Sequence, residues 1–193
     1  KGHEFNVDKA TSLMREAGYA NGNGFPTLDF YVNAIEGSSI HKSCLAVAAQ
    51  LKKNLNVNLK VVLCSLDERE AAIGSGKAKI WREGWIADYP DPENFLTMFY
   101  SHNIRDNGSM VNAFKFSNPE YDVALEKALV EIDPDKRNAL FVKCDQMIVD
   151  HGPVIPILTD DHIVKINARV RNFEAAAMEE HNLTDVFIKE QKK

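Results

Sequence analysis

The sequence joins a strand to a helix through residues 84–95, which are Gly84-Trp85-Ile86-Ala87-Asp88-Tyr89-Pro90-Asp91-Pro92-Glu93-Asn94-Phe95. The residues at 79–86 mix Ile and Trp with basic side chains and predict a strand that leaves a sheet. Asp91 supplies an N-cap side chain and Pro92 a proline at the first helical position, so we expect a helix over residues 95–99. Asp88 then lies where a strand ends and a helix begins, which in open α/β sheets is the usual edge of a ligand crevice.

Apolar residues before this segment alternate between helical and strand periods. Helical spacing occurs over residues 10–17 and 40–51, and strand alternation over residues 28–32 and 57–63. Ser65 followed by Glu68 has the pattern of a capping box, and predicts a short helix that ends near Gly74 or Gly76. This β-α-β order predicts an α/β fold in which helices flank an open β-sheet.

The second half of the chain contains two more legible helix starts. Asn-Pro at 118–119 and Asp-Pro at 133–134 repeat the pairing of a cap with a proline. The second of these helices should end at residues 151–152, where His is followed by Gly. The sequence therefore predicts a helical region after the β-α-β part.

Beyond residue 152 the pattern predicts short strands and loops. Residues 154–158 are apolar, but Pro153 and Pro156 lack ladder donors, so an edge strand or a segment crossing between lobes is expected. A polar turn is predicted at 160–162, and further strands at 163–166 and 186–188.

Composition limits the class of protein. The chain has 193 residues, of which 45% are apolar, enough for one ordinary domain, or a domain and a tail. A net charge of −5 argues against nucleic acid as a partner, because phosphate binding requires a clustered basic surface. No apolar run is long enough for a membrane span. Residue 1 is Lys and no signal peptide is present, so we expect a fragment cut from a longer precursor.

The three cysteines, Cys44, Cys64 and Cys144, are widely spaced and contain no Cys-x-x-Cys pair. All three lie in apolar surroundings, which favours buried thiols that pack as small hydrophobes. A disulfide between two of them stays open as an alternative in an oxidising compartment.

The motif Gly-Trp-x-x-Asp-Tyr-x-Asp-Pro at residues 84–92, followed by an aromatic-rich helix, resembles the signature of family 5 extracellular solute-binding proteins. These are the peptide-binding components of bacterial ABC importers. The resemblance extends to residues 10–26, to Asn-Pro-Glu-Tyr-Asp at 118–122, to Arg137 and to residues 153–157, in the order of that family. It therefore covers almost the whole chain.

This resemblance implies a lobe of the type II periplasmic-binding-protein kind. Residues 1–158 would be the C-terminal ligand-binding lobe. Residues 159–193 would be a return segment that packs on an N-terminal lobe absent from this chain, which would leave the strand near residues 185–189 without a partner. The implied location is periplasmic or extracytoplasmic, with a lipid anchor through the missing N-terminus as one form of attachment.

The resemblance also implies a site that holds short peptides. A peptide presents an ammonium group, a carboxylate and repeated amides, and a receptor needs an anchor for at least one charged end. Asp88 matches the aspartate that binds the ligand's free N-terminal amine, with Trp85 and Tyr89 beside it. Arg82 matches a position where some members hold the ligand carboxylate. No cofactor and no metal are expected.

Each of these residues has a structural alternative. The Asp88 carboxylate could accept hydrogen bonds from backbone N–H groups of the turn. Trp85 could belong to the core, and Tyr89 could cover the turn. Arg82 could form a surface ion pair with Glu83 or Asp88.

An enzyme is disfavoured by the spacing of the candidate groups. Asp91 is committed to starting a helix, and Cys144 lies on the apolar face of its helix, where a thiol is inert. His151 and Asp160 complete no recognisable set, and the histidines show no metal-binding spacing. The resemblance implies instead the substrate-binding component of an ABC importer, which delivers short peptides to a membrane permease. A ligand-sensing lobe of a regulator and a binding protein for a non-peptide solute are the alternatives.

Overall fold

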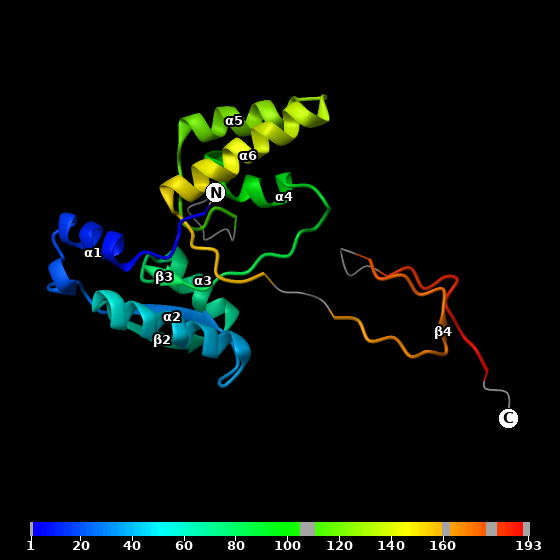
Figure 1. The fold of residues 1–193 in the computed structure, drawn as a ribbon, viewed down its shortest axis with the longest axis horizontal. Helices are drawn as coiled ribbons and strands as arrows, with labels where there is room; N and C mark the ends of the chain where they lie inside the picture. Colours follow the sequence, from blue (N-terminus) through cyan, green and yellow to red (C-terminus); the bar gives the residue numbers. More distant parts are fainter. Residues whose placement is uncertain (1, 105–110, 160–162, 177–180, 191–193) are drawn as a thin grey trace.

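The computed structural model describes residues 2–104, 111–159, 163–176 and 181–190 (Figure 1). Its helices are α1 (Val7–Glu16), α2 (Ser39–Leu55), α3 (Leu66–Gly74), α4 (Glu93–Leu96), α5 (Pro119–Val130) and α6 (Pro134–His151). Its strands are β1 (Leu28–Asn33), β2 (Leu59–Cys64), β3 (Ile80–Trp81), β4 (Val170–Arg171) and β5 (Phe187–Ile188). Short 3₁₀ turns lie at Ala20–Gly22, Thr97–Phe99 and Ser101–Asn103. No helix within these ranges is both long enough and apolar enough to cross a membrane.

A parallel sheet with strand order β2-β1-β3 organises the first half of the chain. Alternate residues of β1 face opposite sides of the sheet. Phe30 and Val32 pack with Cys44 of α2, and Tyr31 packs with Ala72 of α3. The two helices therefore cover opposite faces, as parallel sheets require. This confirms the predicted α/β class and the open sheet flanked by helices.

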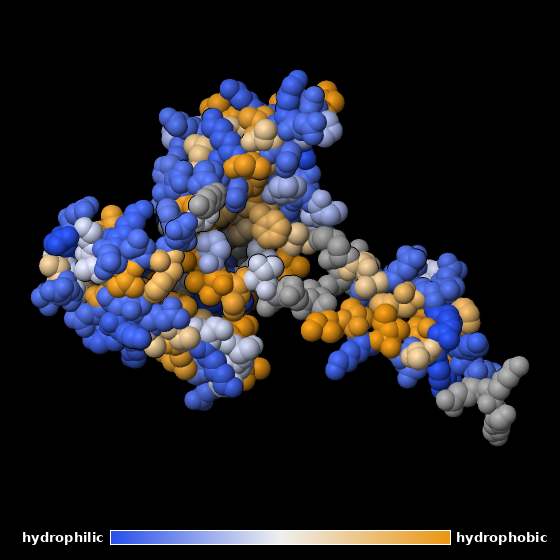
Figure 2. All heavy atoms as spheres, in the orientation of Figure 1, coloured by the Kyte–Doolittle hydropathy of each residue, from blue (hydrophilic) through white to orange (hydrophobic). Residues whose placement is uncertain are grey.

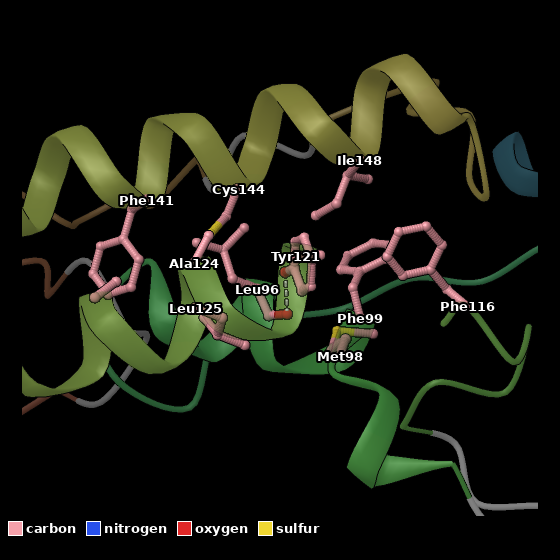
Figure 3. Close-up of a cluster of buried hydrophobic side chains, with 11 residues drawn as sticks. Leu96, Met98, Phe99, Phe116, Tyr121, Ala124, Leu125, Phe141, Cys144 and Ile148 are labelled. Atoms are coloured by element: carbon pink, nitrogen blue, oxygen red, sulfur yellow. Dashed lines mark hydrogen bonds between the residues drawn. The ribbon is translucent and has the colours of Figure 1, made fainter. Parts of the chain in front are cut away.

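Helices α4, α5 and α6 form a second layer with its own apolar core (Figure 3). Side chains of α6 point toward α5, and residues of the α4 region complete the cluster; its members include Leu96, Phe99, Tyr121, Leu125, Phe141, Cys144 and Ile148. The hydroxyl group of Tyr121 donates to the Leu96 carbonyl oxygen at 2.6 Å, which satisfies the polar atom of a fully buried ring. Figure 1 shows this helical layer beside the sheet, joined to it by the segment after β3.

Helix ends follow the capping rules closely. Side-chain oxygens of Asn6, Ser38, Ser65, Asn118 and Asp133 accept backbone N–H groups in the first turns of five helices. The capping box of Ser65 and Glu68 is complete, and α6 ends where Gly152 adopts φ of 61°. The helix starts at 118–119 and 133–134 and the end at 151–152 are therefore confirmed.

Two strand boundaries differ from the prediction for identifiable reasons. The strand expected at 57–63 begins at Leu59, because the N–H of Val57 donates to the Leu51 carbonyl oxygen at the end of α2. The strand expected at 79–86 is only Ile80–Trp81 long. After Trp81 the N–H of Arg82 still donates to the Tyr31 carbonyl oxygen, but the Arg82 carbonyl oxygen accepts from the Arg69 side chain instead of from a strand.

The segment after residue 152 departs most from the prediction. Residues 154–158 and 163–166 form no strand, whereas the strand predicted at 186–188 is present as β5. The expectation that β5 lacks a partner is wrong, because β5 pairs antiparallel with β4. The polar turn predicted at 160–162 lies outside the described residues.

This C-terminal segment extends away from the two layers and carries apolar side chains on its surface (Figures 1 and 2). Its large exposed hydrophobic residues include Ile155, Ile157, Leu158, Ile163, Phe187 and Ile188. A two-residue ladder of hydrogen bonds buries almost none of this surface. The predicted strands at 154–158 and 163–166 do not form, because none of the strands in the described ranges pairs with them.

Among the described glycines, Gly22 has the closest backbone neighbour to where a Cβ would stand. Its φ is +72°, and a Cβ there would lie 2.5 Å from the Leu55 carbonyl oxygen at the end of α2. Gly24 has a similar φ of +78° but nothing within 4 Å of the same position. Both glycines thus have a positive φ, which favours glycine, but only at Gly22 is there also no room for a Cβ.

We expect Gly24→Ala to lower the free energy of unfolding by about 1–2 kcal/mol, the cost of a left-handed conformation for a residue with a Cβ. Gly22→Ala should cost about 2–4 kcal/mol, because the clash with the backbone adds to the same strain. Urea unfolding of the chain, followed by circular dichroism, measures both. Equal losses in the two variants would contradict the close approach at Gly22.

Candidate ligand-binding site

The carboxyl ends of the parallel strands lie at one edge of the sheet, and the candidate site begins there. Asn33 ends β1 and Cys64 ends β2, and the Asn33 amide donates to the Cys64 carbonyl oxygen at 3.4 Å. The chain leaves β3 at the same edge and runs through residues 82–92 to α4. The strand-to-helix junction is therefore at the edge where ligands bind in open α/β sheets.

Arg69 of α3 fixes the exit from β3. Its side chain is 2% exposed, donates to the Arg82 carbonyl oxygen at 3.1 Å, and pairs with the Glu83 carboxylate at 3.0 Å. A buried guanidinium with two such partners is costly to move, because displacement would leave a buried charge uncompensated. Arg69 thus fixes residues 82–83 from α3, the helix that covers one face of the sheet.

The Arg82 side chain is half-buried and lies against the backbone of Gly84. A Cβ at residue 84 would lie 3.0 Å from Nη2 of Arg82, so the glycine leaves room for the guanidinium. The structural alternative for Arg82 is wrong, because Glu83 pairs with Arg69 and no ion pair joins Arg82 to Asp88 among the described residues. The Arg82 charge is therefore not neutralised by either of these carboxylates.

Asn94, the second residue of α4, joins the two other leading candidates. Its Oδ1 accepts from the Trp85 indole Nε1 at 2.7 Å and from the Asp88 backbone N–H at 3.2 Å. Its Nδ2 donates to Oδ2 of Asp88 at 3.1 Å. Asp88 is exposed, whereas Trp85 is half-buried and packs against the helical core. The structure thus brings Trp85 and Asp88 together through one amide side chain.

This arrangement bears on the alternatives for Asp88 and Trp85. The Asp88 carboxylate accepts from the Asn94 side chain, and no backbone N–H donates to it in the part of the chain that the structure describes. Trp85 contributes to the core as well as reaching the surface, so its two interpretations are not exclusive.

Asp91 anchors the start of α4 to α6. Its carboxylate accepts from the backbone N–H of Glu93, the first residue of α4, at 2.9 Å, although the N-cap position of this helix is Pro92 and not Asp91 as predicted. It also forms a bidentate pair with Arg137 of α6, with contacts of 2.6 and 3.2 Å. The guanidinium holds the pKa of the Asp91 carboxyl below its usual range, and the Asp91 carboxylate raises the pKa of Arg137. The Arg137 guanidinium also stacks over the Phe141 ring, 4.5 Å from its centroid.

Tyr89 lines a groove to which Asp88 does not contribute. A groove of about 520 Å³ separates residues 87–96 from one face of α6, and Tyr89, Phe95 and Val142 line it, whereas Asp88 does not. The Tyr89 side chain is 41% exposed. The structure therefore brings Trp85 and Asp88 together but turns Tyr89 toward the helical layer.

The remaining reactive groups are dispersed. The three cysteines are free, and they belong to three separate apolar clusters, with Cys44 and Cys64 on opposite faces of the sheet and Cys144 in the helical layer. Burial raises the pKa of the Cys144 thiol, in agreement with the predicted inert thiol. The described residues contain no metal-binding group of His, Cys, Asp and Glu, and Asp160 lies outside them.

Two residues that hold the segment 82–88 in place, Arg69 and Asn94, were not predicted from the sequence. Arg69 stands among charged residues in the sequence, as residues on an exposed turn of a helix do, and nothing in the sequence shows that it is buried. Asn94 stands beside two acids and a proline at a helix start, where a polar residue is ordinary. Its burial, at 6% exposed, was the missing information.

Comparison with protein families gives a match over residues 1–107 to the model described as bacterial extracellular solute-binding proteins, family 5 Middle. The chain belongs to the family 5 extracellular solute-binding proteins. This family consists of binding proteins and not of enzymes.

Several named proteins resemble this member of the family in sequence. The periplasmic oligopeptide-binding protein OppA of Escherichia coli is 30% identical over 155 residues, which are 78% of this chain and 26% of OppA. The heme-binding protein A of Haemophilus influenzae is 26% identical over 175 residues, 89% of this chain and 30% of that protein. The chain thus spans a quarter to a third of the length of these relatives.

Solved structures of the family agree with the fold. The Haemophilus influenzae OppA complex with the peptide RPPGFSPFR matches with a TM-score of 0.68 and 26% identity, over 78% of this chain and 28% of that one. The clavulanic acid biosynthesis oligopeptide binding protein 2 matches with a TM-score of 0.81 over 96% of this chain and 34% of that one, at 18% identity, and so bears on the fold alone. The periplasmic-binding-protein type II fold is therefore shown for this solute-binding protein.

The Asp91–Arg137 pair should contribute to stability in a pH-dependent way. A cycle of Asp91→Asn, Arg137→Gln and the double variant should give a coupling of about 0.5–1 kcal/mol at pH 7, since both side chains are about a quarter exposed. The pKa of Asp91 is lower when folded than when unfolded, so the coupling is present above the unfolded pKa and is lost as pH falls through the folded pKa.

Urea unfolding at a series of pH values from neutral to acidic measures this coupling. Lys136→Gln is a matched control on the same helix, because its ion pair with Asp133 is exposed and has a contact of 3.7 Å. A coupling that stays constant across the acid range would show that Asp91 and Arg137 do not interact as charges.

Proposed function

We propose that this chain is one lobe of a substrate-binding protein that captures short peptides for an ABC importer and delivers them to a membrane permease. The observation that carries the proposal is the state of the Asp88 carboxylate. It is exposed at the strand-to-helix junction, and Asn94 holds its Oδ2 while Oδ1 accepts no hydrogen bond from the described residues. A charge-assisted bond from a ligand ammonium to such an oxygen would contribute about 1.5–3 kcal/mol.

The remaining site residues take complementary roles in this proposal. Arg82 would attract the carboxylate end of the ligand, since neither Glu83 nor Asp88 neutralises its charge. Trp85 would supply an apolar wall beside Asp88. Tyr89 remains a candidate through the groove beside α6, which it lines. The peptide in the solved Haemophilus influenzae OppA complex supports a peptide as the class of ligand.

The proposed protein has two lobes, and this chain supplies one wall of the cleft. Residues 1–158 form the C-terminal ligand-binding lobe, and residues 159–193 return to the N-terminal lobe. The exposed apolar side chains of the C-terminal segment support this division, because such surface normally meets another part of a protein (Figure 2). The OppA relatives have room for a second lobe, since this chain covers only 26% of the Escherichia coli protein.

Closure of the two lobes around the ligand is the proposed mechanism. Closure would bury the ammonium group and Asp88 away from water, which strengthens their attraction. The ligand favours the closed state only as far as it binds that state more tightly, and this difference shifts the hinge equilibrium. The permease would then bind the closed form, outside the cytoplasm, where the periplasmic relatives act.

A non-peptide solute is the second candidate, and a specific observation favours it. Heme-binding protein A of Haemophilus influenzae is 26% identical over 89% of this chain, about as similar as the OppA of the same organism, which is 25% identical over 90%. The exposed Asp88 carboxylate, of which Asn94 holds only Oδ2, favours an amine-bearing ligand over such a solute. The two candidates therefore differ in whether binding depends on Asp88.

In the complete two-lobed protein, Asp88→Ala should weaken binding of a short peptide with a free N-terminus by about 2–5 kcal/mol, the cost of truncating one partner of a buried charge pair. This is roughly 30-fold to a few thousandfold in Kd. Isothermal titration with a mixture of short peptides, each with a free or an acetylated N-terminus, measures it. Asp150→Ala, which removes an exposed carboxylate on α6, is the matched control and should leave Kd unchanged.

An Asp88→Ala protein that binds as tightly as the parent would show that Asp88 is structural. If no peptide of the mixture gives heat with the parent protein, the ligand is another solute. The acetylated peptide separates these cases from a true anchor, because it lacks the ammonium group that Asp88 is proposed to hold.

The isolated 193-residue chain should bind the same peptides at least about 100-fold more weakly than the complete protein, because one wall of the cleft cannot exclude water from the charge pair. Titration of both proteins with one peptide checks this difference. Micromolar binding by the chain alone would contradict the need for closure.

A further inference from the structure

Asn94 is a buried polar residue, and its side-chain hydrogen bonds in the described structure are all with candidate site residues. It is 6% exposed, and its three side-chain hydrogen bonds go to Trp85 and to Asp88. A purely structural asparagine caps a helix or ties down a loop by bonding to backbone groups. One of the three bonds, from the Asp88 backbone N–H, is of this kind, whereas the other two join the Trp85 indole and the Asp88 carboxylate.

The chemistry of an amide fixes the direction of these bonds. The Trp85 Nε1–H and the Asp88 backbone N–H are both donors, so both must meet the oxygen of Asn94. The NH₂ group is then directed to the Asp88 carboxylate, which only accepts when ionised. A reversed amide would place donors against donors and one oxygen against another, so the network permits a single orientation.

Asn94 is itself held from the helical layer. Its backbone N–H donates to the Asp91 carbonyl oxygen at 3.1 Å, and the Asp91 side chain is clamped by Arg137 of α6. The position of the amide is thus set through Asp91, which α6 holds by way of Arg137. A group supported in this way can hold a neighbouring carboxylate in one rotamer.

We propose that Asn94 is the positioning residue of the amine subsite, holding the Asp88 carboxylate by Oδ2 so that Oδ1 faces the ligand ammonium. This inference rests on the proposed function. Asn94 also ties the Trp85 indole to the same amide, so that the apolar wall and the anion keep a fixed relation. The consequence is specificity: a ligand without a positive amine gains nothing from the orientation that Asn94 imposes.

A double-mutant cycle in the complete two-lobed protein tests this role. The variants are Asn94→Ala, Asp88→Ala and both together, each titrated with one peptide that has a free N-terminus. Asn94→Ala should raise Kd about 3- to 10-fold in the parent, the usual range for one hydrogen bond to a charged group. In the Asp88→Ala background the same change should raise Kd less than about twofold, because there is no carboxylate left to orient.

Matched controls separate positioning from folding. Asn112 is also a buried asparagine, 1% exposed, with three side-chain hydrogen bonds, to Tyr100 and Phe116. Asn112→Ala should lower the unfolding temperature and leave Kd within about twofold of the parent. If Asn94→Ala does not fold, Asn94→Leu fills the same volume and permits the same cycle.

The cycle has three outcomes, which bear differently on the positioning role and on the proposed function. Loss of the Asn94 effect in the Asp88→Ala background supports the positioning role. Equal losses in both backgrounds overturn it and leave peptide capture by Asp88 intact, since Asn94 would then act through Trp85 or through the fold. No effect of Asp88→Ala by itself overturns the proposed function first, and the inference with it.

Discussion

The bidentate pair between Asp91 and Arg137 is the interaction on which the arrangement of the site depends. The chain between β3 and α4 has no ladder partner, because β3 ends after two residues. Because no sheet aligns it, such a segment has a fixed backbone conformation only if other contacts hold both of its ends. Arg69 holds the end next to the sheet through Arg82 and Glu83, and Arg137 holds the end next to α4. Two arginines from different layers thus define the path of residues 82–92.

Much of the fold was predictable because its signals are local. Capping residues such as Ser65, Asn118 and Asp133 act within four residues of themselves, so their pattern is complete in the sequence. The parallel sheet followed from alternation in the two strands that flank α2. Strand length was less predictable, because it depends on the neighbour: β3 stops where the Arg69 side chain takes the carbonyl oxygen of Arg82. The same dependence explains why apolar residues 154–158 form no strand.

The residues of the candidate site also fall into those that the sequence indicates directly and those that only the packing reveals. Trp85 and Asp88 stand in a motif that the sequence displays directly, and the structure brings them together. Asn94 and Arg69 could not be selected, because only burial distinguishes them from ordinary polar residues near helix starts. Tyr89 lines a groove beside α6 that Asp88 does not line, so adjacency in the sequence does not place these two side chains on one surface. Neighbours in an irregular segment can serve different surfaces, and only the packing of α6 decides which.

The distribution of the thiols has a consequence for how this fold depends on its redox surroundings. Cys44, Cys64 and Cys144 occupy three separate clusters, two of them on opposite sides of one sheet, and all three are free. A crosslink between any two would require a sheet or a core to open, because a disulfide needs Cα atoms within about 7 Å and suitably directed side chains. The described fold therefore draws no stability from oxidation, and thiol oxidants and thiol reductants in the surrounding medium act on no crosslink in it. Its three cysteines contribute to it by packing as reduced thiols.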